Sequence, residues 1–278
     1  MSLQIFAKLI VVAFVVTTML GVGLHLSLQE IREPFRSTKL TLFAVIGKFL
    51  VVPALAFFIA RVGGLPRPVA TGILVLGTAA GAPILPKLAQ FANGNLGFSV
   101  GLMFLLMMIS ILYMPLVLPL LLPAAHVRPW LIAKPLFSVV ATPLVIGLLM
   151  KFWKESIATC LEPYFRRAST VFLALAILVV FTADYENGGP RISFALIMAG
   201  GLLVLFSLGC GFLLGGPSLA TRKVLGLGTA QRDLSAALVV AVQNFAEPEV
   251  LSVLIAMALL GICLLIPIAI ALGRRVAQ

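Results

Sequence analysis

The chain has 278 residues, of which 62% are hydrophobic and only 10% are charged, and its mean hydropathy is +1.18. A soluble domain carries nearer a quarter of charged residues, so this composition excludes an ordinary soluble protein and predicts an all-α polytopic membrane protein, integral to the cell membrane. The net charge of +11 is scattered between apolar runs, so it indicates membrane topology rather than a nucleic-acid partner.

The hydropathy predicts nine transmembrane elements within one domain, 1–278. They cover residues 9–28, 40–60, 68–92, 96–122, 130–150, 169–183, 192–214, 219–245 and 248–272. The first apolar run is too long for a signal peptide, so it is interpreted as a membrane helix. The distribution of lysine and arginine between the connecting segments favours an N-terminus outside the cell and a C-terminus in the cytoplasm.

Two of these elements, 68–92 and 219–245, are interrupted near their middle. The expected breaks contain helix-weakening residues and their neighbours: Gly81, Pro83, Pro86, Lys87, Gly228 and Thr229. Proline lacks an N–H and clashes with the preceding turn of a helix. Glycine and proline also merely kink many membrane helices. Two interruptions at matched places, each beside an ionisable residue, nevertheless predict a transporter core whose breaks cross near the bilayer midplane.

Charged residues occur inside the apolar elements. Arg232 and Asp233 follow Gln231 in the eighth element, and Lys48 lies in the second. Charges at bilayer depth are costly and face a polar cavity or a partner. We expect Lys48, Arg232 and Asp233 to form one cluster, in which the two cations and the half-helix N-termini attract an organic anion and Asp233 is the counter-ion. A structural ion pair between Lys48 and Asp233 is the alternative.

Lys87 has two interpretations. At the start of the second half of the broken third element, it is expected either at the cytoplasmic mouth of the substrate path or at the membrane interface, with its ammonium group reaching toward water.

Two motifs resemble those of the bile acid:sodium symporter family. Met19-Leu20-Gly21-Val22-Gly23-Leu24 is similar to M-x-G-x-G-L, and Gly94-Asn95-Leu96-Gly97-Phe98-Ser99-Val100 is similar to G-N-x-x-L-S-V. The chain thus resembles a divergent, bacterial-type member. The resemblance implies inverted repeats, a panel domain and a core domain, and two crossing discontinuous helices. The first repeat would be 1–124, without its first helix, and the second 128–273.

The resemblance also implies where sodium-coupled members bind sodium, and this chain departs there. The serine Ser99 is kept, whereas other ligand positions hold Lys48, Leu85, Pro86, Met103, Gly228, Arg232 and Asp233; a shift of one residue would place Gln231 on the family's glutamine. A fixed positive charge repels sodium, so no sodium site is expected. No metal or other cofactor is predicted.

The resulting hypothesis is a secondary transporter of a small organic anion in the bilayer, either proton-coupled or working by exchange. Arsenite-type efflux is a weaker alternative, because it relies on a cysteine in the first broken helix and Cys160, Cys210 and Cys263 lie elsewhere. An enzyme is not expected, since a nucleophile and base at one depth are missing from the pattern. A channel is the other alternative. The sequence does not predict the oligomeric state.

Overall fold

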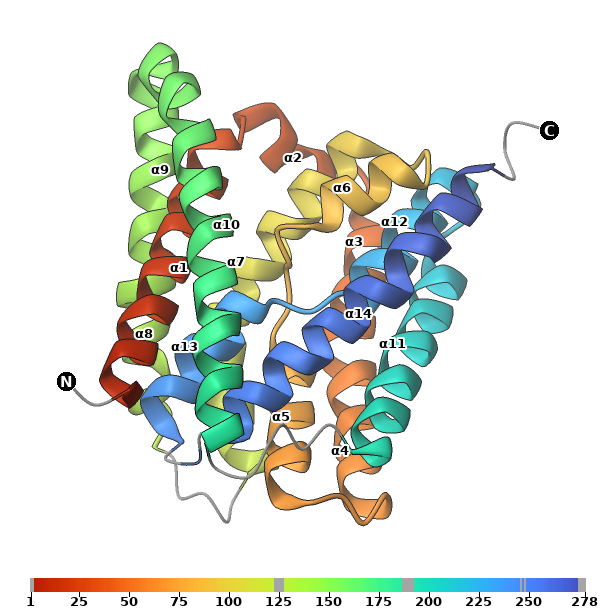
Figure 1. Cartoon of the computed structure of the whole chain (residues 1–278). Coiled ribbons are helices and arrows are strands. Elements are labelled where there is room, and N and C mark those ends of the chain that lie inside the picture. The colour runs from red at the N-terminus through yellow and green to blue at the C-terminus, as the bar shows by residue number, and fades with distance from the viewer. Residues whose placement is uncertain (1–2, 123–127, 187–192, 246, 248, 275–278) are drawn as a thin grey trace.

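The computed structural model describes residues 3–122, 128–186, 193–245, 247 and 249–274, and these segments form helices without β-strands (Figure 1). Five α-helices are continuous: α1 (Leu3–His25), α7 (Leu96–Leu121), α10 (Glu155–Glu186), α11 (Phe194–Leu214) and α14 (Glu249–Arg274). Two further spans contain a π-helical turn. One consists of α3 (Thr38–Ile46), η1 (Gly47–Val51) and α4 (Val52–Val62), and the other of α8 (Pro129–Pro135), η3 (Leu136–Ala141) and α9 (Thr142–Trp153).

These seven spans are long and apolar enough to cross a membrane, and they correspond to seven of the nine predicted elements. The protein is therefore an all-α polytopic membrane protein. Two predicted boundaries need correction. The first helix begins and ends earlier than 9–28, and α10 begins at Glu155 rather than at 169, because its polar first turns continue the helix beyond the apolar run.

The two π-helical turns have a common local cause. Each lies directly before a dipeptide that ends in proline, Pro53 after η1 and Pro143 after η3. Proline has no N–H and displaces the carbonyl four residues earlier, which loosens the helical ladder. The carbonyl of Phe49, four residues before Pro53, instead accepts a hydrogen bond from the Tyr113 hydroxyl of α7. This widened turn carries Lys48 into the protein interior.

The remaining two predicted elements are interrupted helices. The first consists of α5 (Arg67–Thr78) and α6 (Leu85–Phe91), and the second of α12 (Leu219–Ala230) and α13 (Leu234–Asn244). Both interruptions were predicted, but each lies a few residues away from its predicted place. The breaks cover 79–84 and 231–233, rather than 81–86 and 229–231.

Local chemistry explains these shifts. Pro86 lies in the first turn of α6, where a missing N–H leaves no helical hydrogen bond unmade, and Lys87 follows it in the same turn. Gly228 and Thr229 remain within the last turn of α12. Of the residues expected in the first break, Gly81 and Pro83 do lie there.

The two breaks meet in the centre of the molecule, where Figure 1 shows the extended segments crossing. The main-chain N–H of Asp233 donates to the carbonyl of Ala79 at 3.5 Å. Gly81 permits close approach to α7, because it has φ +89° and a Cβ there would lie 2.3 Å from the Met107 nitrogen. The first break is thus held by a main-chain hydrogen bond to the second break and by close main-chain packing against α7.

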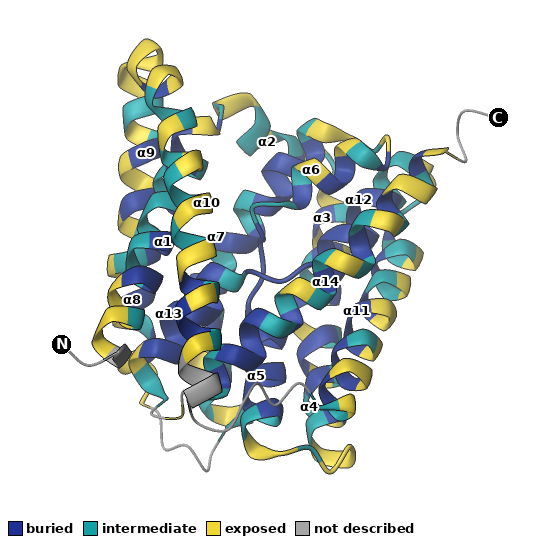
Figure 2. Ribbon diagram, viewed as in Figure 1, coloured by how far each residue is buried: buried dark blue, intermediate teal, exposed yellow. Residues whose placement is uncertain are grey.

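The helices pack as two groups. In one, α1 lies along α9 and α10, and in the other, α3–α7 and α11–α14 surround the crossing. Close backbone contact at Gly23 and Gly147 joins α1 to α9, since a Cβ on Gly23 would lie 2.3 Å from the Leu144 carbonyl oxygen. The short helix α2 (Leu28–Arg36) links the groups. Figure 2 shows buried residues around the crossing and exposed residues on the outer helix faces. The repeat boundaries 1–124 and 128–273 stay a prediction.

Candidate functional site

Lys48 reaches from η1 to the end of α12. Its side chain is buried, with 1% of the residue exposed. The Nζ atom donates to the carbonyl oxygen of Thr229 at 3.2 Å and to that of Gln231. Both carbonyls lie at the C-terminal end of the half-helix α12, where the partial charge of the helix dipole is negative. The lysine thereby binds main-chain oxygens that the break leaves without helical partners.

Arg232 lies within the second break and binds the same end of α12. Its Nη1 donates to the Thr229 carbonyl at 2.8 Å, so Lys48 and Arg232 share one acceptor. Its Nη2 donates to the Ser207 hydroxyl of α11 at 2.7 Å. The Nε atom is buried and has no hydrogen-bond partner among the described residues. Nε is therefore the one nitrogen of this guanidinium group that makes no hydrogen bond among the described residues.

Asp233 occupies the N-cap position of α13 and is fully buried. Its Oδ1 atom accepts from the main-chain N–H groups of Ser235 at 2.9 Å and Ala236 at 3.3 Å. The Oδ2 atom has no hydrogen-bond partner in the described part of the chain. A carboxylate at a helix N-terminus satisfies free N–H groups and interacts favourably with the positive end of the dipole.

This arrangement corrects two expectations. No ion pair within salt-bridge distance joins Asp233 to Lys48 or Arg232 in the described residues, so the structural ion pair is absent and each charge is held by hydrogen bonds to uncharged groups. The N-terminus of α13 is also not free for a substrate, because the protein's own carboxylate binds it. Lys48 nonetheless contacts the break that contains Arg232 and Asp233, and a joint role of the three charges in binding a substrate stays a prediction.

Gln231 contributes its main chain rather than its amide. It lies at the C-cap of α12, is 7% exposed, and offers its carbonyl oxygen to Lys48. Ser99 is fully buried near the start of α7, and its hydroxyl donates to the Leu96 carbonyl at 2.7 Å. Among the described residues, no hydrogen bond joins the Ser99 hydroxyl to the charges at the break.

Lys87 lies away from those charges on the exposed surface of α6. Its ammonium donates to the Gln90 side chain at 2.9 Å and lies 5.1 Å from the centre of the Phe91 ring. Both contacts lie within α6, and the two interpretations of Lys87 stay predictions.

Three contributing residues were missed by the sequence reasoning. Ser207 binds Arg232, and Ser110 holds the first break by accepting from the Ala80 N–H at 3.1 Å. Single serines in apolar helices give a weak signal. Lys223 was counted as a topology charge, yet it is 1% exposed and donates to the Ala92 carbonyl at the end of α6 at 2.8 Å. It therefore ties α12 to α6.

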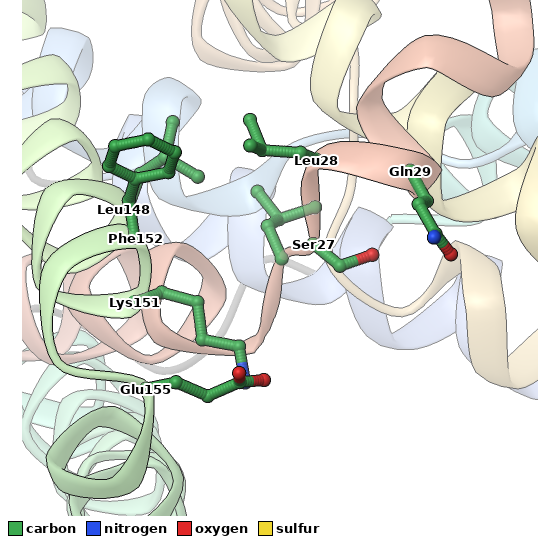
Figure 3. Close-up of a pocket in the computed structure, with 8 residues that line it drawn as sticks. Ser27, Leu28, Gln29, Leu148, Lys151, Phe152 and Glu155 are labelled. Carbon is green, nitrogen blue, oxygen red and sulfur yellow. The ribbon is translucent and has the colours of Figure 1, made fainter.

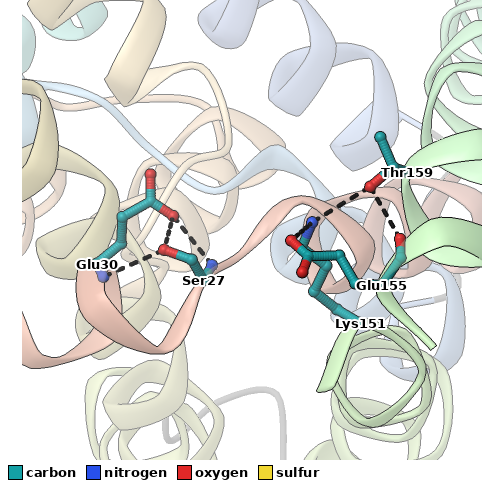
Figure 4. A network of polar contacts seen from close by, with 5 residues as sticks. All are labelled: Ser27, Glu30, Lys151, Glu155 and Thr159. Carbon is teal, nitrogen blue, oxygen red and sulfur yellow. Dashed lines mark hydrogen bonds and ion pairs between the residues drawn. The ribbon is translucent and has the colours of Figure 1, made fainter. Parts of the chain in front are cut away.

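A separate pocket of about 230 Å³ lies where α1 meets α2, beside the adjoining ends of α9 and α10 (Figure 3). Its lining residues are Leu26, Ser27, Leu28, Gln29, Leu148, Lys151, Phe152 and Glu155. Figure 4 shows two polar groups beside it. The Ser27 hydroxyl and the Glu30 carboxylate cap α2 reciprocally, and Lys151 pairs with Glu155 at 3.1 Å. None of the buried charges lines this pocket.

The fold and the buried charges together define a polytopic membrane protein with crossing interrupted helices. Residues 12–188 match the model of the Sodium Bile acid symporter family. The chain belongs to the sodium bile acid symporter family. The matched segment contains Lys48 and the first break, whereas Arg232 and Asp233 lie beyond it.

Two similar proteins carry names that agree with this family. The chain is 25% identical over 209 residues to the uncharacterized sodium-dependent transporter YocS of Bacillus subtilis (strain 168), a match that covers 71% of this chain and 60% of the relative. It is 26% identical over 249 residues to the probable sodium/metabolite cotransporter BASS1, chloroplastic, of Arabidopsis thaliana, covering 83% of this chain and 58% of that protein. The chain thus spans 58–60% of the length of these relatives.

Proposed function

We propose that the protein is a secondary transporter of a small organic anion in which Lys48 and Arg232 take the place of bound sodium. The observation that carries this proposal is the placement of the Lys48 ammonium on the carbonyl oxygens of Thr229 and Gln231. In transporters with broken helices, unwound carbonyls and half-helix C-terminal ends are the groups that coordinate a coupling cation. Here the Lys48 ammonium already forms hydrogen bonds to these carbonyl oxygens.

Electrostatics argue against adding sodium to this place. Two unit charges 4 Å apart interact by about 4 kcal/mol at an effective dielectric constant of 20, and Lys48 and Arg232 would both repel the ion. The curated relatives are named as sodium-dependent or sodium/metabolite transporters. The present chain would therefore have kept the fold and lost the coupling ion, and would depend on proton coupling or on exchange of one anion for another.

The positive charge also supports an anionic substrate. Arg232 keeps its Nε donor without a partner, and the buried cations outnumber the one buried carboxylate at the break. We further infer that the N-terminus faces outward and the C-terminus faces the cytoplasm, because the basic residues of the connecting segments favour that orientation.

The test is uptake of labelled organic acids into proteoliposomes that contain the purified protein. Sodium is exchanged for potassium at equal ionic strength. We expect saturable uptake with the same rate in both salts, since saturation distinguishes a carrier from a channel. Uptake that rises saturably with sodium alone would contradict the replacement of sodium.

A further inference from the structure

We propose that the crossing carries one excess positive charge, and that this excess makes the transported species a monoanion whose movement transfers no net charge across the membrane. This inference rests on the proposed transport function and deepens it. It concerns the charge of the substrate and the electrical character of the transport cycle, which a sodium substitution alone does not determine.

Among the described residues, four charged side chains are buried: Lys48, Lys223, Arg232 and Asp233. Lys223 binds Ala92 near the other end of α12. Position 230, where α12 ends, is seven residues after Lys223, which at 1.5 Å per residue is about 10 Å along the helix. Two cations and one carboxylate remain at the crossing.

Each of these three charged groups makes two hydrogen bonds. Lys48 donates to two carbonyl oxygens, and Arg232 donates to a carbonyl and a hydroxyl. Asp233 accepts from two main-chain N–H groups. Each group thus has partners that stabilise its charged form, because carbonyls are acceptors and N–H groups are donors. The sum of the three charges is +1.

The excess positive charge has an energetic cost inside the membrane. A net charge at the centre of a bilayer costs about 2.5–3.5 kcal/mol on insertion scales. A bound monoanion removes the excess, and so does departure of the Lys48 proton. The crossing is then neutral when it carries the anion. It is also neutral on its return, either because a second anion is bound or because Lys48 has lost its proton. Both routes move a monoanion without net charge.

Two atoms without partners favour one negative charge over two. The buried Arg232 Nε offers a donor to a carboxylate, whereas the buried Asp233 Oδ2 is an acceptor that repels a second carboxylate. A dianion would also leave the occupied crossing with a charge of −1. The site therefore fits a monocarboxylate better than a dicarboxylate of similar size.

The test measures initial uptake of labelled propionate, benzoate and succinate into proteoliposomes at three membrane potentials. Potassium gradients with valinomycin impose an inside-positive, a zero and an inside-negative potential. The vesicles contain unlabelled substrate, and a second series replaces it with an imposed pH gradient. We expect uptake of a monocarboxylate in preference to succinate, with rates that differ less than about twofold between the potentials.

Lys48→Met gives the decisive contrast. Without the lysine charge the occupied crossing becomes −1 and the empty crossing becomes 0. In the series without internal substrate, where the crossing returns empty, inside-positive potential should therefore accelerate uptake of the monocarboxylate by more than threefold. The upper bound is about 50-fold at 100 mV, for one charge that crosses the whole field. Lys39→Met, which removes an exposed lysine at the start of α3, should keep the voltage-independent rates of the unmodified protein.

The outcomes separate the two proposals. If the unmodified protein takes up the monocarboxylate and inside-positive potential accelerates this uptake, charge balance is wrong while anion transport stands. A preference for succinate would also overturn it. If none of the three anions, nor any other organic acid tested for uptake, enters under any condition, the proposed function itself fails. The measurement on the unmodified protein decides the question even if Lys48→Met does not fold.

Discussion

The Lys48 ammonium donates to the Thr229 carbonyl across a separation of 181 residues in the chain. This contact joins a π-helical turn, created before a proline, to the end of an interrupted helix. Arg232, which lies within the break, donates to the same carbonyl from three residues further along the chain. One main-chain oxygen thereby organises both buried cations, and the following predictions test the consequences of that arrangement and of the packing around it.

Arg232→Gln should abolish substrate uptake or reduce it at least tenfold. The substitution removes the permanent positive charge and its hydrogen bonds to Thr229 and Ser207, and a hydrogen bond to a charged group contributes about 1.5–3 kcal/mol. Uptake of a labelled organic acid into proteoliposomes measures the effect. Arg61→Gln, at the exposed end of α4, is the control. Full activity of Arg232→Gln would remove Arg232 from the binding site.

Gly81→Ala should destabilise the protein by about 3 kcal/mol or more. The new Cβ would lie 2.3 Å from the Met107 nitrogen, at a positive φ that L residues rarely adopt. The melting temperature of the protein in detergent should therefore fall. Gly201→Ala is the matched control, because nothing lies within 4 Å of its Cβ position in α11. Equal melting temperatures for both variants would contradict the tight crossing.

Lys223→Met should lower stability by about 1–3 kcal/mol, because the buried Ala92 carbonyl loses its ammonium donor. Methionine retains an unbranched apolar side chain, so the change mainly removes the charge and the hydrogen bond. Thermal unfolding in detergent measures the loss, and Lys87→Met provides the exposed-lysine comparison. An unchanged melting temperature would show that Lys223 does not hold α12 against α6.

Ser27→Ala should lower stability by about 0.5–2 kcal/mol, because Ser27 caps α2 together with Glu30. Ser37 supplies the control within the same linker, since its side chain makes no capping hydrogen bond at the start of α3. Thermal unfolding should therefore distinguish Ser27→Ala from Ser37→Ala. If both serines contribute equally, the reciprocal cap is not what stabilises α2.

Local sequence predicted that both helices are interrupted, but not the exact residues at which each interruption begins and ends. Glycine, proline and charge predicted both broken helices, since these residues weaken the helical ladder wherever they occur. The exact ends of the breaks were shifted, because Pro86 is compatible with the first turn of α6 and Gly228 is tolerated inside α12. Propensity therefore located each break, and packing at the crossing set its limits.

Composition alone determined that this chain belongs in a membrane and that its few interior charges matter, because the transfer free energy of apolar and charged groups depends on residue type. Only the tertiary structure decided which group each buried charge binds. Asp233 is bound by the N-terminus of α13 rather than by Lys48, and Lys223 is buried while its neighbour Arg222 is partly exposed. Such choices depend on which carbonyl or N–H group another helix brings within hydrogen-bonding distance, and no local pattern encodes that distance.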